Sequence, residues 1–201
     1  QAAASGSADG EFNLGVSYAT GQGVAKDLAA AVKWYRLAAE QGHVNAQLAL
    51  GNAYFHGIGV DQDANAAIPW LRRAAEKGLA PAQAMLGYAY QTGQGVKADP
   101  AAAIHWYRLA AKQSDVSALI NLGDAYRLGH GVAPDPAAAY RLYYRAAEKG
   151  APRAMNDVGF QLLRGTGVEE NQVEGAKWLK RAAERGQPNA MHTLGSLYAR
   201  G

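Results

Sequence analysis

The stretch GIGVDQD, residues 57–63, determines how the rest of the chain is interpreted, because its glycine pair returns at a constant interval. The pairs are GQGV at 21–24, GIGV at 57–60, GQGV at 93–96, GHGV at 129–132 and GTGV at 165–168, and each begins 36 residues after the one before it. Self-similarity at a period of about 20 to 50 residues is the signature of a repeat architecture. The sequence therefore predicts an array of repeats.

Two other patterns keep the same period. Glycines that follow a leucine or, once, a valine recur at Gly15, Gly51, Gly87, Gly123, Gly159 and Gly195. Ala-Ala pairs recur at 38–39, 74–75, 110–111, 146–147 and 182–183. No insertion or deletion interrupts the period. We therefore interpret residues 1–201 as a single array, with repeats that begin near residues 8, 44, 80, 116 and 152 and a partial repeat at 188–201.

Residues 44–78 indicate what one repeat contains. Ala46, Leu50 and Tyr54 recur every four residues, which is typical of one face of a helix. Gly57 ends this first helix, because glycine adopts a positive φ at little cost. An Asp or Asn then begins a second helix, since its side chain accepts hydrogen bonds from the free amides of the first turn; these residues are Asp27, Asp63, Asp99, Asp135 and Asn171.

The glycine pair itself has two interpretations. A phosphate-binding loop would follow a strand and carry a Lys-Ser/Thr pair, and neither is present. We therefore interpret Gly-x-Gly-Val as the connection between two helices.

The glycines of the set that includes Gly51 lie inside the first helix, where glycine costs about 1 kcal/mol relative to alanine. Close helix packing explains that cost, with the Ala-Ala pair of the second helix as the expected matching surface. The fifth repeat has Gln161 and Leu162 in place of Ala and Tyr, so its packing is expected to differ.

Composition excludes several classes of function. The formal net charge is +3, and the basic residues are interleaved with acids, which argues against nucleic-acid binding. The chain contains no run of 18 apolar residues, so we expect no membrane insertion. The absence of Cys excludes disulfides. The five histidines occupy five different positions of the repeat, and no catalytic motif is present. We expect no enzyme activity, no metal and no cofactor. Because the chain begins with Gln, we expect it to derive from a longer one.

Two motifs resemble a known family. The words LGNAY, LGYAY and LGDAY at 50–54, 86–90 and 122–126 match the L-G-x-x-Y pattern of tetratricopeptide repeats. The period of 36 residues and the W-x-x-x-A-A-E-x-G pattern at 34–42 and 70–78 are more similar to the Sel-one-like repeat family. The resemblance implies an all-α fold, a right-handed α/α superhelical solenoid of about five helix-turn-helix repeats. It also implies an interaction scaffold, often in exported or periplasmic bacterial proteins.

One stripe on the first helix varies between repeats while the core positions hardly change. We call it the variable stripe. In this architecture the first helix is expected to line the concave surface, so the stripe supplies the candidate binding residues Leu48, Asn52, Phe55, Tyr88, Gln91, Asp124, Arg127, Phe160 and Leu163. Phe55, Tyr88 and Phe160 are expected to be exposed aromatic anchors. The alternative is that individual stripe residues pack against the neighbouring repeat.

Together these patterns predict a monomeric, non-catalytic protein-protein interaction scaffold that binds a protein or peptide along the variable stripe. Two alternatives stay open. One is a glycan- or peptidoglycan-binding module, which groove aromatics and the exported relatives favour. The other is a hydrolase or metal site in the groove that no motif reveals.

Overall fold

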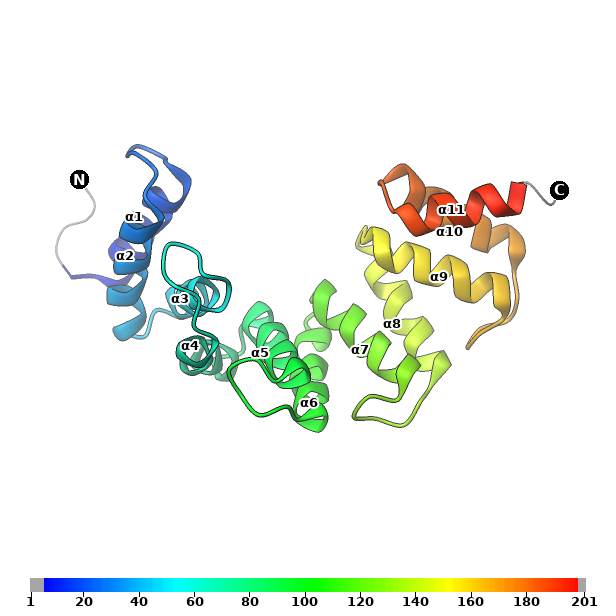
Figure 1. Cartoon of the computed structure of the whole chain (residues 1–201), viewed down its shortest axis with the longest axis horizontal. Helices are drawn as coiled ribbons and strands as arrows, with labels where there is room; N and C mark the ends of the chain where they lie inside the picture. The colour runs from blue at the N-terminus through cyan, green and yellow to red at the C-terminus, as the bar shows by residue number, and fades with distance from the viewer. Residues whose placement is uncertain (1–5, 199–201) are drawn as a thin grey trace. The chain divides into compact units, whose positions relative to one another are not determined.

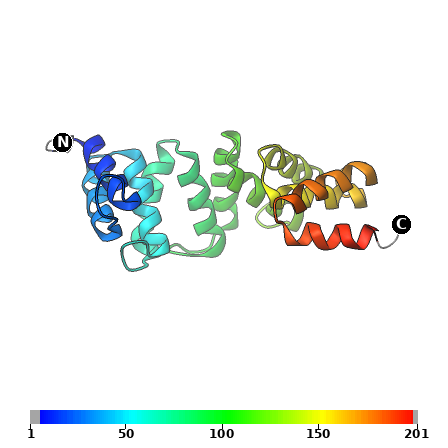
Figure 2. The same cartoon turned by 90° about the horizontal axis from the view of Figure 1, so that it is seen from above.

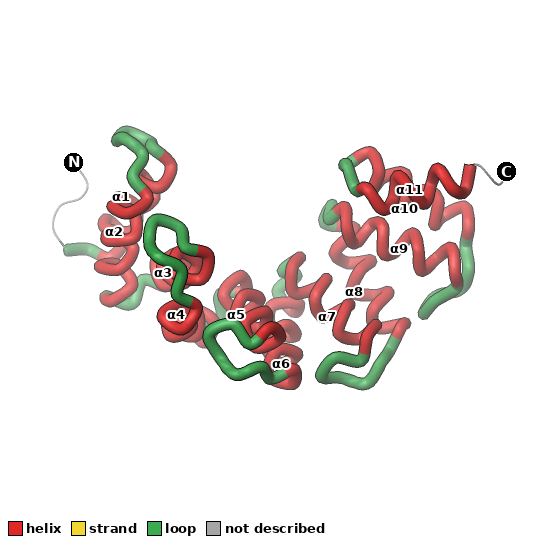
Figure 3. Tube along the Cα trace, viewed as in Figure 1, coloured by secondary structure: helices red, strands yellow, loops and turns green. Residues whose placement is uncertain are grey.

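The computed structural model describes residues 6–198 (Figure 1). Over this range the chain forms eleven α-helices joined by loops, and the described residues contain no strand (Figure 3). The helices are α1 (Ala8–Thr20), α2 (Leu28–Glu40), α3 (Val44–His56), α4 (Ala64–Glu76), α5 (Ala80–Thr92), α6 (Pro100–Lys112), α7 (Val116–Leu128), α8 (Pro136–Glu148), α9 (Pro152–Arg164), α10 (Gln172–Glu184) and α11 (Pro188–Tyr198). The predicted all-helical fold with two helices per 36 residues is confirmed.

The helix boundaries follow the capping residues. Each second helix is preceded by a side chain that accepts a hydrogen bond of 2.8–3.0 Å from the backbone amide three residues later: Asp27, Asp63, Asp99, Asp135 and Asn171. These bonds satisfy amides that have no partner within the helix. The predicted N-caps are confirmed at all five positions.

The stretch GIGVDQD connects α3 to α4 and has a structural role. Gly57 ends α3 with a φ of 71°, in the left-handed region that favours glycine, and its amide bonds to the carbonyl of Ala53. Gly59 also has a φ of 71°, and a Cβ atom there would overlap the carbonyl oxygen of Leu28 at the start of α2. The second glycine therefore lets the loop lie against the preceding repeat.

The chain divides into two compact units, which we call the N-terminal unit (to Trp106) and the C-terminal unit (from Tyr107). In the N-terminal unit, α1 packs on α2, α2 on α3, α3 on α4 and α4 on α5 (Figure 2). In the C-terminal unit, α7 packs on α8, α8 on α9, α9 on α10 and α10 on α11. Successive helices in each unit therefore bury their apolar faces against one another.

Four interior glycines of the first helices, Gly15, Gly51, Gly123 and Gly159, are packing contacts, as predicted, whereas no described atom lies within 4 Å of the Cβ position of Gly195. A Cβ atom at Gly51 would lie 2.7 Å from Leu71, and one at Gly159 would lie 2.7 Å from Leu179 and 2.9 Å from the carbonyl oxygen of Gly175. The prediction that the Ala-Ala pair of the second helix packs against these glycines is wrong. The glycine instead accommodates a Leu or Tyr side chain of the second helix, because the missing Cβ leaves room for a large group.

The described helices are too short or too polar to cross a membrane. Buried leucines and alanines dominate the core, for example Leu50, Leu71 and Ala74 in the N-terminal unit. Leu119, Val158 and Leu179 have the same role in the C-terminal unit.

Candidate functional site

The variable stripe of the N-terminal unit is largely packed into the protein. Phe55 is only 3% exposed and belongs to a cluster with residues of α4 and α5. Its ring meets that of Tyr88 edge-on, with the centroids 6.2 Å apart. The prediction that Phe55 is an exposed anchor is therefore wrong. The side chain extends from α3 into the contact with the next repeat, where burial of an aromatic ring is favourable.

The other stripe residues of this unit are distributed between core and surface. Leu48 is half-buried against the same cluster, and Asn52 is half-buried. Tyr88 is 42% exposed, and Gln91 is exposed. The exposed part of the stripe in the N-terminal unit thus lies on α5.

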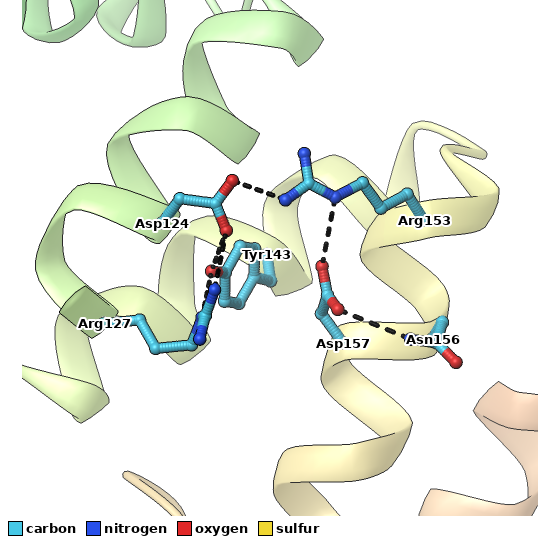
Figure 4. A network of polar contacts seen from close by, with 6 residues as sticks. All are labelled: Asp124, Arg127, Tyr143, Arg153, Asn156 and Asp157. Carbon is cyan, nitrogen blue, oxygen red and sulfur yellow. Dashed lines mark hydrogen bonds and ion pairs between the residues drawn. The ribbon is translucent and has the colours of Figure 1, made fainter. Parts of the chain in front are cut away.

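In the C-terminal unit, the equivalent positions on α7 hold Asp124 and Arg127, which belong to a polar network with residues of α8 and α9 (Figure 4). The hydroxyl of Tyr143, on α8, donates a hydrogen bond of 2.8 Å to Oδ1 of Asp124 on α7. Nε of Arg127 donates to the same hydroxyl at 3.3 Å, and the Arg127 guanidinium lies 3.5 Å from Asp124. Tyr143 is fully buried, and burial together with the Asp124 bond raises its pKa. Its hydroxyl therefore stays protonated and keeps donating.

Arg153 joins this network to α9. Its guanidinium donates to Oδ2 of Asp124 at 2.5 Å, and its Nε lies 3.8 Å from Oδ2 of Asp157 (Figure 4). Arg153 and Asp157 are four residues apart, so they share one face of the helix. Asn156 donates to the other Asp157 oxygen at 3.4 Å. Burial raises the pKa of Asp157, and the charge of Arg153 opposes that shift.

A pocket of about 430 Å³ opens beside the network, and we call it the α9 pocket. It is built from α7, α8, α9 and α11. The lining residues are Arg127, Tyr143, Asn156, Asp157, Phe160, Gln161, Asn189, His192 and Thr193. Phe160 is 41% exposed, and the guanidinium of Arg164 lies 4.4 Å from its ring centroid. Leu163, the remaining predicted residue, instead packs against α10 at Gly175.

Gln161 is the unusual residue of the α9 pocket. It is only 4% exposed, and within the described part of the chain neither Oε1 nor Nε2 has a hydrogen-bond partner. A buried amide without partners costs about 1–3 kcal/mol. The buried Gln83 of the N-terminal unit differs, because its Nε2 donates to the carbonyl of Ala75 at 3.1 Å. The α9 pocket therefore contains a donor and an acceptor that folding leaves unused.

The chemistry of the site favours binding. Two carboxyl groups, Asp124 and Asp157, face two guanidinium groups, Arg127 and Arg153. No three His, Asp or Glu side chains of the described residues are grouped closely enough to hold a metal ion. The site offers balanced charges, the exposed aromatic ring of Phe160 and the carboxamide of Gln161, which has no partner within the described chain.

Sequence reasoning found part of this site. Asp124, Arg127 and Phe160 were predicted as stripe residues, and the structure brings Arg127 and Phe160 together at the pocket, with Asp124 bonded to the pocket residue Tyr143. Arg153 and Asp157 were missed, because their positions lie outside the stripe. Gln161 left a signal, since it replaces the alanines Ala53, Ala89 and Ala125, but that departure predicted altered packing and not a polar site.

The family model of the Sel1 repeat matches the chain five times, at residues 8–43, 44–79, 80–115, 116–150 and 152–187. The matches cover most of the chain and coincide with the two-helix repeats described above. No curated protein matches the sequence.

Two solved structures share both sequence and fold with the chain. A protective antigen present in uropathogenic Escherichia coli strains, which displays an SLR fold, is 41% identical with a TM-score of 0.91. A Sel1 repeat protein from Oxalobacter formigenes is 40% identical with a TM-score of 0.90. The alignments cover 98% and 99% of this chain, but 42% of the antigen and 81% of the Oxalobacter protein. The chain thus spans less than half the length of the antigen.

A third structure, a Sel1 repeat protein from Klebsiella pneumoniae, is similar in fold alone, with 22% identity and a TM-score of 0.63 over 98% of this chain. The predicted fold class, an all-α repeat array of the SLR type, is confirmed by these matches.

Proposed function

The chain belongs to the Sel1 repeat family, and on that premise we propose that it binds a protein or peptide partner through the exposed part of the variable stripe, without catalysis. Proteins of this family commonly mediate protein-protein interactions and are generally non-catalytic. The family indicates only the general role; the binding surface and the class of partner are our proposal for this chain.

The observation that supports it is the exposure of large side chains on first helices of both units. Tyr88 lies exposed on α5 and Phe160 on α9, and Arg127 is exposed on α7. The equivalent positions of other repeats hold unrelated residues, such as Asn52 in place of Tyr88 or Phe160. The repeat fold therefore does not require these side chains. Exposed aromatic and Arg residues are the types that dominate binding energy at protein interfaces.

The charge pattern agrees with a protein partner. Arg127 is held by Tyr143 and Asp124 in one orientation, which reduces the entropy that it loses on binding. Such rim charges contribute orientation and association rate more than affinity. The aromatic side chains would then supply most of the affinity.

The test compares two matched triple variants against a partner captured by affinity purification, identified by mass spectrometry and purified. The stripe variant is Tyr88→Ala, Arg127→Ala, Phe160→Ala. The control variant is Leu37→Ala, Arg141→Ala, Val173→Ala, which removes two exposed apolar side chains and one exposed arginine from second helices. Titration calorimetry should show at least about a 30-fold weaker affinity for the stripe variant, as expected for loss of one hot spot.

The control variant should bind as the wild type does, and circular dichroism should show that both variants are folded. Loss of binding in the control variant, with unchanged affinity in the stripe variant, would move the binding surface to the second helices and contradict the proposal.

A further inference from the structure

We propose that the α9 pocket binds an amide group of the protein partner, a main-chain peptide group or an Asn or Gln side chain, through paired hydrogen bonds to Gln161. This inference rests on the proposed function and adds the chemistry of one subsite. The partner group donates to Oε1 of Gln161 and accepts from Nε2.

The unused hydrogen-bonding capacity of Gln161 selects an amide. A carboxamide offers one acceptor oxygen and a nitrogen donor in a single plane. Gln161 lines the pocket, and both of its amide atoms are buried without a partner among the described residues. A ligand that satisfies only one of them leaves the other buried and unpaired, which is unfavourable. Another amide presents a donor and an acceptor side by side and satisfies both.

The neighbouring charges argue against a charged ligand at this point. A carboxylate beside Gln161 would meet the carboxyl group of Asp157, whose Oδ2 is buried without a hydrogen bond within the described chain. An ammonium group would meet the guanidinium of Arg127 on the opposite helix. Both acids of the network are already paired with Arg153. A neutral polar group therefore fits the balance of charges. Oδ2 of Asp157, which is near Arg153 but accepts no hydrogen bond within the described chain, can accept a second N–H from the ligand.

The remaining walls fit a peptide better than a sugar. Pockets for small ligands measure about 300–1,000 Å³, and this one has about 430 Å³. Asn156, Asn189 and Thr193 add polar contacts along the pocket. A sugar ring would stack on an aromatic face, but Arg164 already lies over the ring of Phe160. The exposed part of Phe160 can instead contact an apolar side chain beside the bound amide.

Folding does not need the carboxamide. The equivalent residue is alanine in the second, third and fourth repeats, at Ala53, Ala89 and Ala125. Gln161→Ala therefore restores the residue that the same helix position holds elsewhere in this chain. Gln83→Ala is the matched control, because Gln83 is equally buried but donates to Ala75 within the N-terminal unit.

The test is a nuclear magnetic resonance titration of the full chain with acetyl-Ala-Ala-Gln-Ala-Ala-amide, followed at the side-chain amide of Gln161. We expect saturable shifts with a dissociation constant on the order of 1 mM, which corresponds to about −4 kcal/mol. Gln161→Ala should weaken binding by about tenfold or more, measured at backbone amides of α9 and α11, and Gln83→Ala should leave it unchanged.

Two further probes distinguish the sources of the amide. Acetyl-penta-alanine-amide that binds as well as the Gln peptide identifies a main-chain group, and weaker binding identifies the side chain; each result agrees with the proposal. Di-N-acetylchitobiose that binds when neither peptide does would replace it with a glycan site. Binding that persists in Gln161→Ala, or no shift up to about 10 mM of any probe, would also overturn it.

Failure of the amide subsite can be distinguished from failure of the proposed function. Loss of partner binding in the stripe variant with no effect of Gln161→Ala would leave the proposed function standing and remove only the amide subsite.

Discussion

The first helices of the two units differ in what they do with the same positions. Phe55 in the N-terminal unit and Arg127 in the C-terminal unit lie two repeat periods apart, as do Asn52 and Asp124. Phe55 is buried in an apolar cluster between α3 and α5, whereas Arg127 is exposed and bonds to Tyr143. The helices α3 and α7 have the same length, and an Asp side chain caps the second helix that follows each of them. The comparison indicates that the repeat determines the backbone, and that individual side chains decide whether a position becomes core or site.

The largest expected effect tests the buried half of this comparison. Phe55→Ala should lower the free energy of unfolding by about 3–5 kcal/mol, because it leaves a cavity between α3, α4 and α5. Phe160→Ala should cost at most about 1 kcal/mol, since Phe160 is partly exposed and loses mainly its contact with Arg164. Urea denaturation of both variants measures the difference. Equal losses would show that the two rings are equally buried in solution.

Substitution of the interior glycines by alanine compares how tightly the helices pack at equivalent positions of the two units. Gly159→Ala should destabilise by about 1–3 kcal/mol, because the new Cβ meets the carbonyl oxygen of Gly175, which cannot move aside easily. Gly51→Ala should cost less, since it meets mainly the flexible end of Leu71. Gly195→Ala is the control: no described atom lies within 4 Å of its Cβ position, so alanine should stabilise the helix by up to about 1 kcal/mol. Thermal unfolding would contradict this ranking if Gly159→Ala were the mildest change.

Substitution of two of the buried glutamines, Gln83 and Gln161, should have a smaller effect on stability. Gln83→Ala should lower stability by about 1 kcal/mol, since it removes the hydrogen bond to Ala75. Gln161→Ala should leave stability nearly unchanged, because no bond within the described chain is lost. Chemical denaturation of the two variants, measured side by side, checks this. A large loss for Gln161→Ala would mean that its amide is used in folding and weaken the case for a ligand.

The smallest expected effect is pH-dependent and confined to the C-terminal unit. Burial raises the pKa of Asp157 in the folded state above its ordinary value of 3.8. The folded state therefore binds this proton more tightly than the unfolded state, and the associated stability is present below about pH 4 and lost as the pH rises through the folded pKa. Asp157→Asn removes this dependence, so its stability relative to the wild type should increase as the pH rises above about 4.

Melting temperatures of both proteins, measured from about pH 3 to pH 7, test this relation. A difference between them that stays constant over the range would mean that Asp157 titrates alike in both states. The substitution Asp99→Asn is a suitable control, because it changes an exposed N-cap side chain to another good cap.

The repeat, its helices and their caps could be predicted from the amino-acid sequence, because these features depend on local spacing. An Asp before each second helix and a Gly after each first helix act within one turn of the chain. The interior glycines could also be read as packing contacts, since a repeated Gly inside a helix needs a compensating gain. The residues that pack on them could not be predicted, because the facing position holds Tyr in some repeats and Leu in others, for example Tyr143 and Leu71.

Only the tertiary structure decided which stripe residues form a site. Phe55 and Phe160 are both aromatic residues on first helices, and sequence spacing treats them alike. One is buried because the next repeat covers it, and the other is exposed beside α11. Likewise, Arg153 bonds to Asp124, 29 residues away on another helix. Spacing within one helix determines which residues share its face, but burial and ion pairing depend on which atoms of other helices approach that face.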